Sequence, residues 1–317
     1  MKLNLTPLVP LLVLASCASV CNAQTAVPPP LMVPETQLND IMDGKMPRIP
    51  SFPKIARKPG FLRGYVKGID GKPLVGASIM ILPPTVYGSG LSKRSVIAKT
   101  DANGLYEVAV PSGGCTVWCA GHAVNYRGVR LALPLHPVDG NLDSINTKGD
   151  IENFALLPYG VANVSTSSEN PGYGGAYYGA SFTVNFASRE PEDTNYPQWL
   201  PFGSEIEITL VPDGLQLDGS VGRPIIIRKK VSPKGWFQVN NVPIGQYKIR
   251  ARLTEDGKTV PLVLKDNSNR DRKGGMTPPE SSDWAAILFR SGGGDPVTQR
   301  VPGGGMDRHG LIVERPK

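Results

Sequence analysis

The stretch "TDANGLYEVAVPSGGCTVWC", residues 100–119, contains the pattern that decides the fold. A polar turn at residues 101–104 is followed by alternating apolar and polar residues, and a Pro/Gly turn at residues 111–114 is followed by a second such run. Alternation with a period of two is typical of a strand with one buried face. The stretch therefore predicts two antiparallel strands joined by a turn.

The same pattern of short alternating runs separated by turns extends along most of the chain. "LRGYVKG", "ASIMILP", "SVIAKT", "LYEVAV" and "CTVWCAGHAV" follow one another between Gly- and Pro-containing turns. The 317 residues include 36 glycines and 31 prolines, while 40% of residues are hydrophobic, which is enough for a buried core. Many short strands joined by Gly/Pro turns predict an all-β antiparallel sandwich with almost no helix.

A family resemblance rests on these segments. "GYVKGIDGKPLVGASIMIL" followed by "KTDANGLYEVAVPSGGCTVWCAG" resembles the carboxypeptidase regulatory-like domain, a transthyretin-like β-sandwich. The resemblance covers about residues 60–124 and implies a fold rather than an activity, because the family name describes an accessory domain and not the peptidase. The matching positions are Gly64, Val66, Gly71, Pro73, Leu74, Gly76, Ala77, Thr100, Asp101, Gly104, Tyr106, Pro111 and Gly113.

The pattern recurs in the second half of the chain. "FGSEIEITL" parallels "VGASIMIL", and "SPKGWFQVNNVPIGQYKIRARL" parallels the opening stretch, with one extra residue before its proline turn. Gly235 corresponds to Gly104, and Tyr247 corresponds to Cys115. We therefore expect two transthyretin-like or Ig-like sandwiches in tandem, the second one degenerate and using "SFTVNFA" as its first strand.

Changes in amino-acid composition predict the boundaries of the segments along the chain. The expected organisation is a signal peptide (1–23), a Pro-rich disordered linker (24–58), the regulatory-like sandwich (59–160), a Gly/Tyr-rich connector (161–180), the second sandwich (181–290) and a Gly-rich C-terminal tail (291–317). We expect the tail to be loose, with "LIVERP" adding an edge strand.

The N-terminus has the pattern of an export signal. Lys2 is followed by a short apolar run and then by small residues. The rest of the sequence contains no long apolar run, so no transmembrane helix is predicted. "VCNAQ" offers ordinary cleavage after Ala23, whereas "LASC" resembles a lipobox that would place a lipid anchor on Cys17. We expect the mature protein to begin at Gln24 and to be extracellular, periplasmic or attached to the cell surface.

The two remaining cysteines, Cys115 and Cys119, lie on one expected strand. In the second copy, Tyr247 and the residues at alternate positions after it are apolar and must face the core. Transferring this register predicts that both cysteines point inward, while Trp118 and Ala120 point outward. Four residues of strand span about 13 Å, and a disulfide requires Cα atoms within about 7 Å. We therefore expect two buried, reduced thiols that share no metal ion.

A search for catalytic chemistry finds no recognisable motif. The sequence has only three histidines (His122, His136 and His309) and lacks His-Glu-x-x-His and Gly-x-Ser-x-Gly motifs. We predict no catalytic residue, no metal site, no cofactor and no enzymatic activity. A hydrolase with an unrecognised site is the least favoured alternative.

Two features could bind a ligand. Lys248, Arg250 and Arg252 alternate along one expected strand and form, with Arg228 and Lys230, a basic comb for acidic polysaccharide or lipid head groups, or simply a solvated face. Trp118 is expected to be exposed, and aromatic residues in or near the connector could stack on sugars or pack between the sandwiches: Tyr173, Tyr177, Tyr178 and Trp199.

These observations give one functional hypothesis and one alternative. The first is a non-enzymatic exported protein that acts as a structural or ligand-binding module of the cell envelope or exterior. The alternative is an accessory carbohydrate- or peptide-binding protein for a separate enzyme. An anionic polysaccharide or another envelope protein is the expected partner, and nucleic acid is not, because the net charge of +7 is only modestly basic for this length.

Overall fold

The computed structural model describes residues 28–33, 40–83, 95–138, 142, 145–193, 195–267, 275–289, 291, 295–306 and 308–316. The predicted signal peptide, with Cys17 and the cleavage site at Ala23, lies outside the described residues. Within them, no helix is long and apolar enough to cross a membrane. The helical elements are α2 (Val164–Glu169), η1 (Gly174–Ala176) and η2 (Pro296–Thr298). The prediction of an all-β fold is confirmed.

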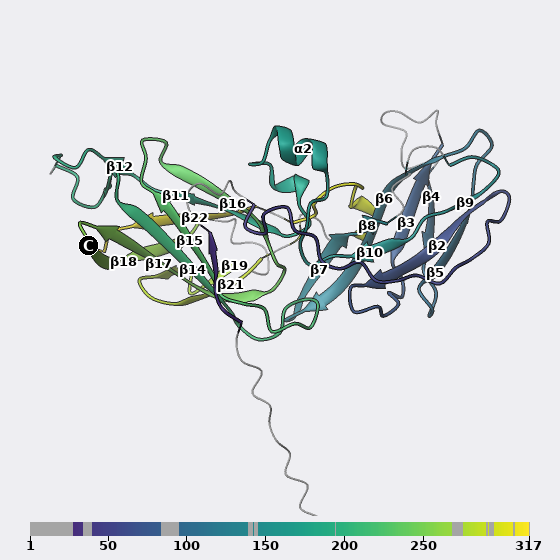
Figure 1. Cartoon of the computed structure of the whole chain (residues 1–317), viewed down its shortest axis with the longest axis horizontal. Helices are drawn as coiled ribbons and strands as arrows, with labels where there is room; N and C mark the ends of the chain where they lie inside the picture. Colours follow the sequence, from purple (N-terminus) through teal and green to yellow (C-terminus); the bar gives the residue numbers. More distant parts are fainter. Residues whose placement is uncertain are drawn as a thin grey trace, which may run out of the picture.

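The strands form two groups that lie side by side (Figure 1), and each group surrounds one large hydrophobic cluster. We call the strands around the cluster of Leu62, Ile79 and Tyr106 the first sandwich. One of its sheets has the order β5-β2-β10-β8, with β9 also paired to β2, and the other has the order β4-β3-β6-β7. The strands are β2 (Phe61–Gly68), β3 (Ser78–Leu82), β4 (Val96–Lys99), β5 (Leu105–Ala109), β6 (Thr116–Tyr126), β7 (Val129–Pro134), β8 (His136–Pro137), β9 (Asp150–Ile151) and β10 (Phe154–Leu156).

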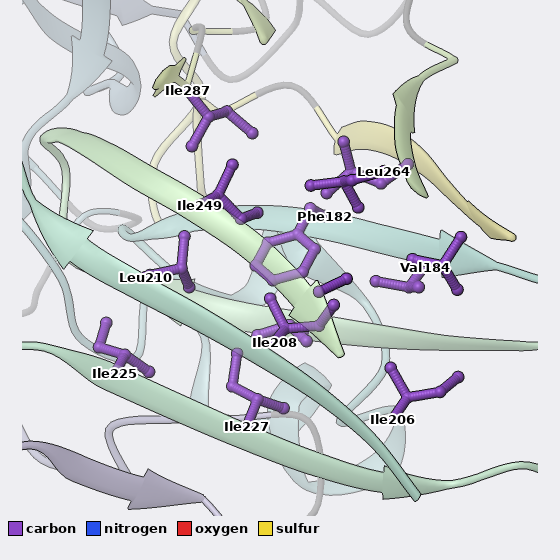
Figure 2. Close-up of a cluster of buried hydrophobic side chains, with 14 of the residues drawn as sticks. Phe182, Val184, Ile206, Ile208, Leu210, Ile225, Ile227, Ile249, Leu264 and Ile287 are labelled. Carbon is purple, nitrogen blue, oxygen red and sulfur yellow. The ribbon is translucent and has the colours of Figure 1, made fainter. Parts of the chain in front are cut away.

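The second sandwich encloses the other cluster, in which Phe182 lies among branched aliphatic side chains (Figure 2). Its strands run in the order β1-β15-β14-β17-β18-β22-β11-β16, with β19, β20 and β21 paired beside this path. They are β1 (Leu31–Val33), β11 (Ala180–Asn185), β14 (Glu205–Pro212), β15 (Ile225–Lys230), β16 (Trp236–Val242), β17 (Gln246–Glu255), β18 (Lys258–Asp266), β19 (Gly275–Thr277), β20 (Glu280–Ser281), β21 (Ala285–Leu288) and β22 (Arg308–Glu314). A small pair, β12 (Ser188–Arg189) and β13 (Leu200–Pro201), lies outside this path.

The two sandwiches share one pairing scheme. In the first, β2 pairs antiparallel with β5 and parallel with β10, and β3 lies between β4 and β6. In the second, β11 pairs antiparallel with β16 and parallel with β22, and β14 lies between β15 and β17. The repeat seen in the sequence therefore corresponds to repeated topology.

The C-terminal tail differs from its prediction. Instead of forming a loose segment with an edge strand, residues 308–314 form β22, which lies between β18 and β11 inside the sheet. Leu311 and Val313 are buried because alternate residues of this strand face the core. The second sandwich thus extends beyond residue 290 and takes its last strand from the tail.

Part of the predicted disordered linker is also ordered. β1 pairs in parallel with β15, from Leu31 opposite Ile225 onward. Ile41 and Met42 are buried in the second cluster, and the Asp40 carboxylate accepts a hydrogen bond from the backbone N–H of Met42. Apolar residues within the Pro-rich segment explain this packing, which composition alone did not predict.

The extra residue of the second repeat forms a β-bulge in β16. Ala180 of β11 lies opposite Val242, but Phe182 lies opposite Val239, so Asn240 and Asn241 together occupy one position of the ladder. Asn241 has a φ of 63°, in the left-handed region that asparagine tolerates better than most residues. The bulge absorbs the insertion without shifting the flanking core residues.

The predicted register of β17 is confirmed. Tyr247 is 1% exposed, and its hydroxyl donates a hydrogen bond to the Pro243 carbonyl oxygen at 2.7 Å. Lys248, the next residue, is exposed. Arg250 departs from the expected solvated position, because it is half-buried and its guanidinium lies 4.3 Å from the centre of the Trp284 ring.

Replacing Tyr247 with alanine tests this register. Tyr247→Ala removes a buried ring from the second cluster and should lower the free energy of unfolding by about 3–5 kcal/mol. Lys248→Ala, the matched exposed neighbour, should change it by less than about 0.5 kcal/mol. Denaturant unfolding of both variants provides the measurement, and equal midpoints would contradict the assignment of faces.

Candidate binding groove

A β-bulge at Trp118 changes the face pattern predicted for β6. Met80 of β3 lies opposite Cys119, but Ile81 lies opposite Val117, so Trp118 has no partner in β3. The register transferred from β17 fails here because the pairing of β17 with β14 is continuous. One extra residue in β6 reverses the alternation beyond it.

Cys115, which directly precedes β6, and Cys119 within it therefore point to opposite sides of the sheet. Cys115 is part of the first hydrophobic cluster. Ala120, predicted to point outward, joins that cluster, whereas Cys119 shares the opposite face with Met80. Both thiols are free and buried, as predicted, but the prediction that Cys119 points into the core is wrong.

The C-terminal segment covers the outer face of β6. The Ala120 N–H donates to the Gln299 carbonyl, and the Val301 N–H donates to the Trp118 carbonyl. A Cβ at Gly121, two residues beyond Cys119 on the same face, would lie 2.3 Å from the Pro296 carbonyl oxygen. Glycine is required at this position because η2 packs directly against the strand.

The Trp118 ring packs against an arginine of the C-terminal segment. The guanidinium of Arg300 lies 4.0 Å from the centre of the Trp118 ring, a cation–π contact. Trp118 is half-buried as a result, so it is not the open aromatic platform that the sequence predicted. Arg300 itself is exposed, and no carboxylate in the described part of the chain forms an ion pair with it.

Beside Arg300 lies a groove of about 620 Å³, which we call the Arg300 groove. One wall is the C-terminal segment, residues 298–306, which includes three consecutive glycines. The other wall comes from α2 and the connector and includes Asn163, Thr166 and Tyr173. The groove therefore combines a cation, polar side chains and an aromatic ring.

Tyr173 presents one side of its ring to solvent. Tyr173 is 50% exposed, and a Cβ at Gly175 would lie within 2.6–2.8 Å of the ring and hydroxyl atoms. The absence of a side chain at Gly175 thus allows the ring to lie against the backbone. An aromatic ring held in this way offers a flat apolar surface to a ligand.

The other connector aromatics serve in packing. Tyr177 and Tyr178 are buried, and the Tyr178 hydroxyl lies 3.1 Å from Nδ1 of His136 in the first sandwich. Burial lowers the pKa of His136 and raises the pKa of Tyr178. Trp199 stacks on Tyr196 with ring centroids 4.2 Å apart.

The basic comb is interrupted by acidic side chains. Glu207 of β14 lies opposite both Arg228 and Arg252, so a carboxylate separates the two arginines across the sheet. Arg228 forms an ion pair with Glu207 at 3.0 Å. The second sandwich carries four of the predicted binding residues, Lys230, Lys248, Arg250 and Arg252. Trp118 belongs to the first sandwich. The predicted site residues therefore do not form one site.

Metal-binding side chains do not gather in the part of the chain that the structure describes. Within it, no group of three His, Cys, Asp or Glu residues is placed to hold a metal ion. His122 lies in β6 and His136 in β8, and burial lowers the pKa of each.

The sequence alone does not single out Arg300, which lines the groove. The glycine runs of the tail predict a loose segment, but glycine also allows close backbone approach. The Gly304 N–H donates to the Gly175 carbonyl, and a Cβ at Gly304 would lie 2.0 Å from the Tyr177 carbonyl oxygen. The sequence feature that points to this contact is the presence of two Gly-rich segments, one in the connector and one in the tail.

Comparisons with known proteins find only distant likenesses. No protein family model matches the chain, and no curated protein matches it in sequence. A candidate carbohydrate-binding protein of Pseudomonas aeruginosa is 10% identical over 33% of this chain and 99% of that chain, with a TM-score of 0.21. The TIE protein of Bacillus anthracis is 14% identical over 63% of this chain and 30% of that chain, with a TM-score of 0.23. The shaft pilin SpaA of Lactobacillus rhamnosus GG is 15% identical over 63% of this chain and 89% of that chain, with a TM-score of 0.16. Scores this low support no conclusion about function, and the fold rests on the sheets described above.

Thiol labelling tests the bulge and its cover. Burial raises the pKa of Cys115 and Cys119 to about 11 each, so at pH 8 only about one thiol in a thousand is ionised at either site. Local detachment of the C-terminal segment requires less unfolding than opening the first cluster. Maleimide should therefore label Cys119 slowly in the native protein and Cys115 only on global unfolding, as read from peptide masses. Immediate labelling of both thiols, or of Cys115 first, would contradict this placement.

Proposed function

We propose that this protein is a non-enzymatic, exported β-sandwich module of the cell envelope or exterior, and that the Arg300 groove binds an acidic polysaccharide. The observation that carries the proposal is a guanidinium positioned on Trp118 at 4.0 Å and free of ion pairs within the described residues. Such a group favours a carboxylate, which it can bind in a bidentate manner.

The remaining groups of the groove suit a sugar chain. The exposed ring of Tyr173 can stack on the apolar face of a sugar ring, while Asn163 and Thr166 can exchange hydrogen bonds with hydroxyl groups. A cavity of about 620 Å³ is large enough for a few sugar residues.

Export and family membership form part of the same proposal. The apolar run after Lys2, with small residues around Ala23, is the support for export, and a lipid anchor on Cys17 is the alternative. The first sandwich is proposed to be a carboxypeptidase regulatory-like domain. Gly71, Gly76, Gly104 and Gly113 of its motif have positive φ, which explains the glycines at these positions. In the alternative proposal, the same groove binds carbohydrate or peptide for a separate enzyme, to which this protein is an accessory.

Binding to polygalacturonate, with neutral dextran as the control polymer, tests the proposed site. Arg300→Ala should weaken binding to polygalacturonate about tenfold or more, because it removes charge-assisted hydrogen bonds. Tyr173→Ala should weaken it several-fold through loss of stacking. Isothermal titration calorimetry at low salt gives the affinities, and dextran should show no binding.

The matched control lies on the basic comb. Arg252→Ala removes the same charge from the second sandwich, and its affinity should stay within about twofold of the unmodified protein. Equal losses in Arg252→Ala and Arg300→Ala would show that attraction is non-specific, and a larger loss in Arg252→Ala would assign the site to the comb.

A further inference from the structure

A second cavity, separate from the Arg300 groove, lies at one end of the second sandwich. The loop between β14 and β15 faces β1 and the chain near Met42, and the cavity among them has a volume of about 390 Å³. Its walls are mainly apolar and include Leu31, Val221 and Ile225. This volume is at the lower end of the range for small-molecule sites, so the cavity suits a compact ligand with an apolar part.

Two opposite charges contribute to the lining of this cavity. Asp218 and Arg223 both line it, and each residue is partly exposed to solvent. Neither side chain forms an ion pair within the described residues. The Asp218 Oδ1 atom accepts a hydrogen bond from the Ser220 N–H at 2.9 Å, which orients the carboxylate within its turn. The other carboxylate oxygen is left available for a ligand.

Backbone hydrogen bonds hold Asp218 beside Tyr159. The Ile244 N–H donates to the Pro158 carbonyl at 2.9 Å, and the Ile244 carbonyl accepts from the Leu217 N–H at 3.0 Å. Tyr159 and Asp218 are the residues that follow Pro158 and Leu217, and both line the cavity. The carboxylate and the phenol therefore reach the cavity from two segments that are fixed to one residue.

The Tyr159 hydroxyl lies within range of both charges. Burial, followed by the nearby Asp218 carboxylate, raises the pKa of Tyr159, and the Arg223 guanidinium opposes this shift. A charge shifts a neighbouring pKa strongly only at short range. Arg223 approaches from the side of β1, because the carbonyl of the next residue, Pro224, accepts a hydrogen bond from the Leu31 N–H at 2.7 Å. The carboxylate and the guanidinium thus lie around one hydroxyl group at the border of the cavity.

We propose that this cavity binds a free apolar amino acid. The Asp218 carboxylate accepts hydrogen bonds from the α-ammonium group, the Arg223 guanidinium binds the α-carboxylate, and the apolar side chain enters the space beside Leu31 and Ile225. A carboxylate and a guanidinium without internal ion pairs each favour a ligand group of opposite charge. A zwitterion supplies both groups in one molecule, whereas a neutral sugar supplies neither.

The end of a peptide offers related chemistry, but only one of the two charges lies beside its terminal side chain. The test therefore compares L-phenylalanine with phenylalaninamide, which keeps the ammonium group alone, and with N-acetylphenylalanine, which keeps the carboxylate alone. Glycine keeps both charges and lacks the side chain. Titration calorimetry of the full protein should detect phenylalanine binding, with an affinity at least tenfold weaker for each of the other three ligands.

Three results of this comparison would overturn the proposal. The first is no binding of phenylalanine. The second is equal or tighter binding of either derivative, which would assign the cavity to one end of a peptide. The third is equal binding of glycine, which would show that the apolar walls do not contact the ligand.

Two variants separate the roles of the charges. Asp218→Asn keeps the oxygen that accepts from Ser220 and should weaken binding of phenylalanine at least tenfold and of phenylalaninamide several-fold, without weakening binding of N-acetylphenylalanine. Arg223→Gln should weaken binding of phenylalanine and N-acetylphenylalanine but not of phenylalaninamide. Equal losses for all three ligands in each variant, as expected from a distorted loop, or unchanged affinities would contradict the proposal. Arg300→Ala should leave phenylalanine binding unchanged, which keeps this test independent of the Arg300 groove.

Discussion

The two asparagines of the β16 bulge connect segments that are distant in sequence. The Asn241 side chain donates to the Asp40 carboxylate at 2.8 Å and accepts from the Gly160 N–H at 2.7 Å. The Asn240 side chain donates to the Pro171 carbonyl at 2.9 Å and accepts from the Gln238 amide at 2.7 Å. Both side chains are 0% exposed, so each of these bonds offsets the cost of burying an amide. One inserted residue thus ties the N-terminal segment and the connector to the second sandwich.

The Arg300 groove depends on this arrangement. The connector, held at Pro171, continues into η1, whose Gly175 carbonyl accepts a hydrogen bond from Gly304 of the C-terminal segment. That segment in turn pairs with β6 and places Arg300 on Trp118. The groove walls therefore come from a connector and a tail that neither sandwich could position alone. The tail then returns to the second sandwich as β22, which fixes both of its ends (Figure 1).

The sequence predicted what depends on local pattern. Alternation predicted the strands and the buried face of β17, and the recurrent turn motif predicted the repeat. The Trp118 bulge was not predictable from alternation, because both cysteines and Val117 are apolar in either register. The path of the tail was not predictable either, because its bonds to β6 and to Gly175 join residues more than a hundred positions apart. Placing Lys248 and Arg252 on one face was correct, but the intervening Glu207 comes from a neighbouring strand that sequence order does not reveal.

We propose that the ligand surface lies where the tail crosses the first sandwich. Hydrogen exchange measured by mass spectrometry, with and without polygalacturonate, tests it directly. Binding in the Arg300 groove should slow exchange in peptides covering residues 163–175 and 298–306, with no change in residues 246–255 of β17. Protection confined to β17 and β15, with exchange at the tail and connector unaltered, would contradict it.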